Sequence, residues 1–153
     1  YIYRRNSKIN YTKRGKSMSH PHSDHSGNRP EKPVLSPQFL SASHRSLFFQ
    51  RLNDLTRSQQ TSPEYQAVLF ILTSDTELYD KMSPYFSSEG FRSFDLFDEV
   101  DFSGGYAKIA RAAADLFGQD YETSLSGLVG SLDHDLFHTF LQALIIRKYG
   151  VSG

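Results

Sequence analysis

The distribution of apolar residues changes abruptly near Ser36, and this change limits where a folded core can form. The first 35 residues are rich in Ser, His, Pro and basic side chains, and their few apolar residues are isolated. Such a stretch cannot bury enough apolar surface to offset the entropy that ordering costs. We therefore expect a disordered tail over residues 1–35 and a single helical domain over residues 36–153.

In the second part of the chain, apolar residues recur at the spacing of amphipathic helices. Ser43 is expected to cap the first helix, Pro63 suits a first helical turn, and Gly118 suits the end of a helix. The run from Tyr65 to Leu72 is almost continuously apolar, which favours a buried helix, although its composition would also suit a strand. The sequence predicts an all-α fold, a compact bundle of about five helices.

Residues 83–102 are the least regular part of the predicted domain. Phe94, Leu96 and Val100 alternate with acidic residues in the manner of a strand, and Pro84 interrupts the segment near its start. We expect either a short hairpin or an irregular loop over these residues.

The two parts of the chain carry opposite charge, although the net charge of the whole is zero. Residues 1–35 hold eight Lys or Arg against two Asp or Glu, a net of +6, whereas residues 36–153 hold nine against fifteen, a net of −6. This asymmetry is typical of an interaction tail on a folded body. The first methionine is Met18, and a native start there would make residues 1–17 non-native and the remaining tail nearly neutral.

The chain has no cysteine, which excludes a disulfide, a thiolate nucleophile and a cysteine zinc site. It also lacks an apolar run near the roughly 20 residues of a membrane span, and because the first residues carry charges without an apolar core, we expect no secretory signal there. No G-x-S-x-G motif is present. We expect a cytoplasmic protein, and we expect contact of the basic tail with nucleic acid to be weak.

The order and lengths of the predicted helices resemble those of small uncharacterised bacterial and phage proteins that are known only as a domain of unknown function. The resemblance covers roughly residues 39–149. It implies a helical fold and an origin in bacteria or their mobile elements, and it carries no activity or site residue. The stretches that carry it are FLSASHRSLFFQRL (39–52), YQAVLFILTSDTELYDKM (65–82), FSGGYAKIARAAADLFG (102–118) and LSGLVGSLDHDLFHTFLQALIIRKY (125–149).

An acidic stretch interleaved with aromatic residues is the best functional lead. Its acids are Asp95, Asp98, Glu99 and Asp101. Their spacing and the lack of a central glycine do not fit an EF-hand. They form either an interaction surface for a basic protein or an ordinary acidic loop whose phenylalanines are buried.

His134 and His138 stand four residues apart, so that they share one helix face, as in zinc proteases of the His-Glu-x-x-His type. Asp135 occupies the place of the catalytic glutamate, and no third ligand is evident nearby. The alternative is a pair of surface histidines. The tail residues His20, His22 and His25 are a second, weaker metal-binding candidate.

Two functions follow from these candidates. The first is a non-enzymatic protein-interaction protein without a cofactor, a phage or mobile-element accessory factor that binds a protein partner through its acidic surface. The second is a small zinc-dependent enzyme that uses His134 and His138. The lack of a complete catalytic set favours the first.

Overall fold

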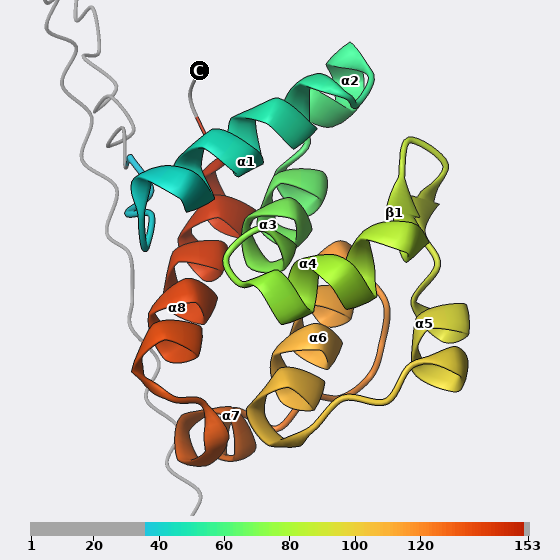
Figure 1. Cartoon of the computed structure of the whole chain (residues 1–153), viewed down its shortest axis with the longest axis vertical. Helices are drawn as coiled ribbons and strands as arrows, with labels where there is room; N and C mark the ends of the chain where they lie inside the picture. The colour runs from blue at the N-terminus through green and yellow to red at the C-terminus, as the bar shows by residue number, and fades with distance from the viewer. Residues whose placement is uncertain (1–35, 152–153) are drawn as a thin grey trace, which may run out of the picture. The chain divides into compact units, whose positions relative to one another are not determined.

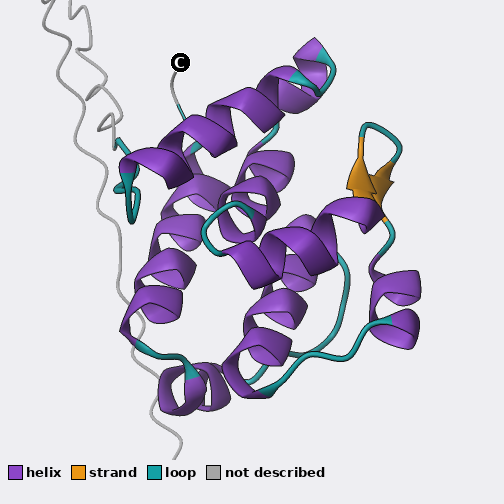
Figure 2. Cartoon of the chain, viewed as in Figure 1, coloured by secondary structure: helices purple, strands orange, loops and turns teal. Residues whose placement is uncertain are grey.

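The computed structural model describes residues 36–151, which belong to one structural unit, Pro33–Gly153. The predicted tail, residues 1–35, lies outside the described residues. The all-α prediction is confirmed, but residues 36–151 contain eight α-helices instead of about five (Figures 1 and 2). The helices are α1 Ala42–Asn53, α2 Arg57–Gln60, α3 Pro63–Leu72, α4 Thr76–Met82, α5 Ser93–Glu99, α6 Gly104–Phe117, α7 Leu125–Ser131 and α8 His134–Tyr149.

Helix α3 occupies the centre of the fold. All seven residues from Gln66 to Leu72 are buried, because the helix packs most extensively against α8 and α6, and α1 crosses it (Figure 1). Pro63 stands in its first turn, as predicted. The run therefore forms a helix, not the alternative strand, and its side chains are buried around most of its circumference.

The cap of α1 differs from the prediction. The N-cap residue is Ser41 instead of Ser43, and the Ser41 hydroxyl accepts a hydrogen bond from the backbone N–H of His44 at 3.0 Å. Ser43 lies inside the first turn, where its hydroxyl forms a hydrogen bond with the Ser41 hydroxyl and with no other described group. Two serines spaced by two residues cannot be told apart as caps from propensity alone.

Residues 83–102 contain more structure than predicted. A 3-10 turn, Ser83–Tyr85, leads into an antiparallel hairpin of β1 (Phe86–Ser87) and β2 (Gly90–Phe91), in which Phe86 pairs with Phe91. The expected short hairpin is thus present. The strand-like interpretation of Phe94 to Val100 is wrong, because Ser93–Glu99 form α5.

The last three helices close the fold. Gly105 allows α6 to approach the end of α7 closely, since a Cβ on Gly105 would lie 3.0 Å from the Ser131 carbonyl oxygen. Gly118 ends α6 in the left-handed conformation (φ +100°), as the sequence predicts. Within residues 36–151, every helix is too short or too polar to cross a bilayer.

Candidate functional site

Helix α5 places a serine in the interior and a phenylalanine on the surface. Ser93 is 1% exposed, whereas the adjacent Phe94 is 83% exposed. Leu96 is fully buried, and Phe97 and Val100 are half-buried, so that the inward face follows helical spacing from Ser93. Phe94 therefore falls on the outward face, the reverse of what hydrophobicity alone predicts.

A polar network holds Ser93 in the interior. Its hydroxyl lies 2.7 Å from the Tyr121 hydroxyl and donates to the side-chain oxygen of Gln119. The Gln119 amide in turn donates to the Phe91 carbonyl at 2.9 Å. This network joins α5, the hairpin and the loop after α6, and it satisfies a buried hydroxyl that would otherwise be costly.

Three aromatic rings cluster beside this network at the surface. The rings of Phe97 and Tyr121 meet edge to face with centroids 5.0 Å apart, and Phe94 lies 6.2 Å from Tyr121. Together with Asp98 they line an open hollow of about 220 Å³. The Arg111 guanidinium lies 4.9 Å from the centre of the Phe97 ring and supports it from the side of α6.

The four predicted acids are all exposed, on α5 and directly after it, and one of them, Asp98, lines the hollow. Asp95 forms an ion pair with Arg92 at 3.0 Å. Glu99 accepts a hydrogen bond from the Tyr85 hydroxyl at 2.7 Å, and this bond raises the pKa of Tyr85. Asp98 and Asp101 have no ion pair with another described residue, so their carboxylates remain available at the surface.

The tertiary structure adds residues that the sequence did not point to. Tyr121 comes from a loop far from α5 in the chain, and its neighbours Asp120 and Glu122 are exposed acids. Glu122 has a positive φ of 51°, which is uncommon outside glycine. No local pattern in residues 118–124 distinguishes them from an ordinary polar loop. We call Phe94, Phe97, Tyr121 and the acids Asp95, Asp98, Glu99, Asp101, Asp120 and Glu122 the α5 surface.

The predicted metal pair has a different environment. His134 is exposed at the start of α8, and His138 is half-buried one turn later. Within residues 36–151, no group of three or more His, Asp or Glu side chains is arranged to hold a metal ion. The tail candidates His20, His22 and His25 lie outside the described residues.

Among the histidines of residues 36–151, His44 is the one that is buried in the core. It is 3% exposed, its Nδ1 accepts from the Leu40 N–H at 3.3 Å, and its Nε2 lies 3.0 Å from the Phe70 carbonyl oxygen. Nδ1 is therefore unprotonated, and Nε2 carries the proton. Burial lowers the pKa of His44; the hydrogen bond to the Phe70 carbonyl opposes this in part, and His138 lowers the pKa further.

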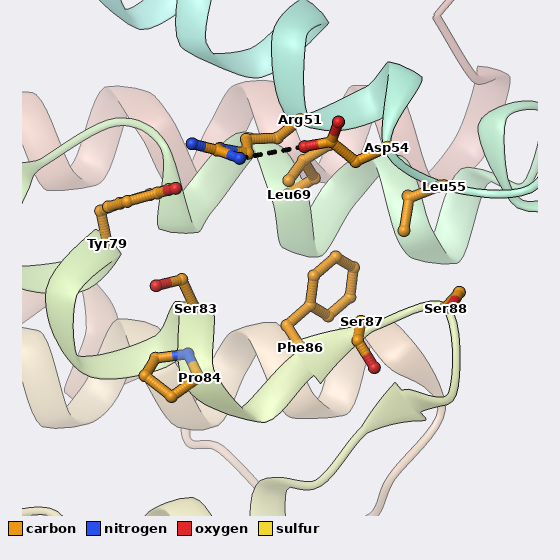
Figure 3. Close-up of a pocket in the computed structure, with 10 residues that line it drawn as sticks. All are labelled: Arg51, Asp54, Leu55, Leu69, Tyr79, Ser83, Pro84, Phe86, Ser87 and Ser88. Carbon is orange, nitrogen blue, oxygen red and sulfur yellow. Dashed lines mark hydrogen bonds and ion pairs between the residues drawn. The ribbon is translucent and has the colours of Figure 1, made fainter.

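A separate pocket of about 390 Å³ opens between α1, α3, the 3-10 turn and β1 (Figure 3). Leu55, Leu69 and Phe86 form its apolar part. Arg51 and Asp54 lie at its rim and form an ion pair at 3.0 Å, with the Arg51 guanidinium 5.7 Å from the centre of the Tyr79 ring. The pocket thus combines an apolar floor with one guanidinium.

Comparison of the chain with models of protein families, with curated proteins and with solved structures finds no match. The resemblance to bacterial and phage proteins of unknown function therefore stays a prediction. The functional interpretation depends on the residues and their geometry.

Proposed function

We propose that the chain is a non-enzymatic interaction protein that binds a basic segment of a partner protein through the α5 surface. One observation carries the proposal: Phe94 is 83% exposed although a serine beside it is buried. A phenylalanine in water beside a serine in the core is the reverse of the usual preference, in which apolar side chains are buried and polar ones are exposed. Such departures are expected mainly at functional sites.

The exposure of Phe94 reduces the stability that the domain could gain from apolar burial, and folding alone does not explain it. Full burial of a phenylalanine stabilises a protein by about 1.5–3 kcal/mol relative to leaving it exposed. On α5 this contribution is absent, while the burial of Ser93 requires a hydrogen-bond network of three further residues. A partner that covers Phe94 would recover the apolar contribution on binding.

The charges around Phe94 indicate the chemistry of the partner. Asp98, Glu99, Asp101, Asp120 and Glu122 form no ion pair with a described residue. Carboxylates beside aromatic faces bind arginine and lysine in two ways, by ion pairing and by cation–π contact. The net charge of −6 over residues 36–153 adds a longer-range attraction for a basic partner.

A binding measurement with paired variants tests the proposal. The full-length chain is titrated against a set of labelled peptides that combine Arg or Lys with an apolar residue, alongside acidic and neutral peptides of equal length. Phe94→Ser and the double variant Asp98→Lys/Glu99→Lys are the test variants. We expect micromolar binding of basic peptides that weakens at high salt and falls at least about tenfold in both variants.

Each test variant has a matched control on another face. Val129 on α7 is 66% exposed, so Val129→Ser removes an exposed apolar side chain away from α5. Asp80 on α4 is exposed and has no ion pair with a described residue, so Asp80→Lys reverses a charge there. Both controls should bind like the wild type. Equal loss in the controls, or no preference for basic peptides, would contradict the proposal.

The proposal includes a cytoplasmic location, which a chain without cysteine suits. It also includes the role of an accessory factor of a phage or mobile element, for which the resemblance of residues 39–149 is the support. In that setting the basic partner is a protein of the bacterial host. Binding to α5 can be tested without knowing which host protein it is.

A further inference from the structure

We infer that the pocket between α1 and the hairpin is a binding site for a small carboxylic acid with an aromatic or branched apolar body. The site lies on different residues from the α5 surface and does not depend on the proposed function. Its volume of about 390 Å³ is within the range of about 300–1,000 Å³ that is typical of small-molecule sites.

Two leucines and a phenylalanine form the apolar part of the pocket. Leu69 of α3 is 2% exposed and Leu55 is 8% exposed, so the floor belongs to the rigid core. Phe86 of β1 projects toward them from the opposite side (Figure 3). An apolar ring between these three side chains would displace water from apolar surface without disturbing the fold.

The polar end of the pocket has an unused hydrogen-bond donor. The Nη2 of Arg51 donates to no other described residue, whereas Nη1 already binds Asp54 and Nε is covered by the protein. A guanidinium has five N–H donors, so a second carboxylate can bind the edge that Asp54 leaves open.

Neighbouring groups hold the guanidinium and add donors. The Tyr79 ring lies 5.7 Å from the guanidinium carbon of Arg51. Figure 3 shows the hydroxyls of Tyr79 and Ser83 at the same end of the pocket as this guanidinium. The arrangement offers one cation and two hydroxyls to an anion, beside an apolar floor.

The charge balance selects a monoanion. Asp54 lies at the rim with its side chain 60% exposed, so its pair with Arg51 is weak and does not close the site. It nevertheless repels a second anion, and the repulsion is larger for a dianion such as a phosphate monoester. A carboxylate with a single charge therefore fits better than a phosphate.

The test compares isosteric probes by NMR titration of the full-length chain. Phenylacetate should cause saturable shifts of the amides of Tyr79, Ser83 and Phe86. Phenylacetamide, which has the same shape without the charge, should bind at least about tenfold more weakly, because a hydrogen bond to a charged group is worth about that factor or more. Acetate and phenyl phosphate should also bind more weakly than phenylacetate.

Two variants separate the site from a non-specific effect. Arg51→Gln should weaken phenylacetate at least about tenfold, and Asp54→Asn should tighten it, because it removes the competing carboxylate. Arg57→Gln, an exposed arginine of α2 outside the pocket, is the control and should bind like the wild type. Absence of saturable shifts, equal binding of phenylacetamide, preference for phenyl phosphate, or unchanged affinity in Arg51→Gln would each overturn the assignment.

Discussion

Helices α3 and α5 both have buried residues, but different interactions attach the two helices to the core. In α3 every residue from Gln66 to Leu72 is buried, and neighbouring helices surround it. In α5 only Ser93 and Leu96 are buried, and a hydrogen-bond network reaches from Ser93 to two other segments. Apolar packing dominates the first helix, and polar contacts direct the second.

A helix can form part of a binding surface only if one of its faces is exposed to solvent. A helix buried around most of its circumference has no free face. A helix held by one leucine and one hydroxyl leaves the opposite face to solvent, where Phe94 and the acids stand.

The largest effect comes from the same substitution in the two helices. Phe70 on α3 is 0% exposed and Phe94 on α5 is 83% exposed. Phe70→Ala should reduce the free energy of unfolding by about 3–5 kcal/mol, because it removes apolar contacts and leaves a cavity. Phe94→Ala should change it by less than about 0.5 kcal/mol. Urea unfolding followed by circular dichroism measures both.

A similar loss in the two variants would contradict the comparison, because it would mean that Phe94 packs against the domain. A neutral Phe94→Ala is also required by the proposed function. It allows a loss of peptide binding in Phe94 variants to be assigned to the surface and not to unfolding.

The second effect is a dependence of stability on pH. It arises from His44 of α1, which packs against α3 at the Phe70 carbonyl. Burial lowers the pKa of His44, so the unfolded chain takes up the proton first as the pH falls below about 6.5. The free energy of unfolding should therefore be highest above that pH. It should fall by up to about 1.4 kcal/mol per pH unit until the pH reaches the folded-state pKa.

Urea unfolding at several pH values between 5 and 8 measures this slope. His44→Gln should reduce it, while His134→Gln, which changes an exposed histidine of α8, should leave it unchanged. If the slope survives in His44→Gln, another group causes it. The His44 hydrogen bond to the Phe70 carbonyl would then have no measurable link to protonation.

The third effect concerns the network that orients α5. Ser93→Ala removes the hydroxyl that contacts Gln119 and Tyr121, and it should destabilise the domain by about 1–2 kcal/mol. Ser46→Ala, at an exposed position of α1, should be neutral or slightly stabilising, because alanine favours helices. Thermal unfolding of the two variants compares them. A neutral Ser93→Ala would show that Leu96 alone fixes α5.

The smallest effect is that of the ion pairs on the two helices. Asp95 pairs with Arg92 on α5, and Glu64 of α3 pairs with Arg147 of α8 at 2.9 Å; in both pairs the side chains are more than a third exposed. Asp95→Asn and Glu64→Gln should each change the free energy of unfolding by less than about 1 kcal/mol. The changes should shrink further in 1 M salt. A larger loss in Asp95→Asn would mean that charge, and not Ser93, holds α5.

Some of the fold could be predicted because the signals are local. Pro63 in the first turn of α3 and Gly118 at the end of α6 stand where the sequence predicts them, and Asp75 and Asp133 cap α4 and α8. The Asp133 carboxylate, for example, accepts from the Leu136 N–H at 2.9 Å. Each of these depends on residues within one turn of the helix end, so sequence spacing contains the information.

The α5 surface could be predicted only in part, because its geometry depends on residues that are distant in the chain. The sequence indicates the acids from Asp95 to Asp101 as a candidate surface, but it predicts a hairpin or loop for their segment. The alternation of Phe94 and Leu96 suggests a strand as long as phenylalanine is assumed to face inward. The partners that bury Ser93 are Gln119 and Tyr121, more than 20 residues away in the chain, and no local pattern reveals them.

Capping and apolar spacing act within a few residues, so the sequence predicts that most of the domain after Ser36 is helical and where some of the helices begin or end. The sequence does not show which face of α5 is buried, which histidine enters the core, or that Arg51 lies beside a pocket with an apolar floor. These outcomes depend on contacts between segments that are distant in the chain, and hydrogen bonds to Ser93 and His44 override the preference of hydrophobicity at each position.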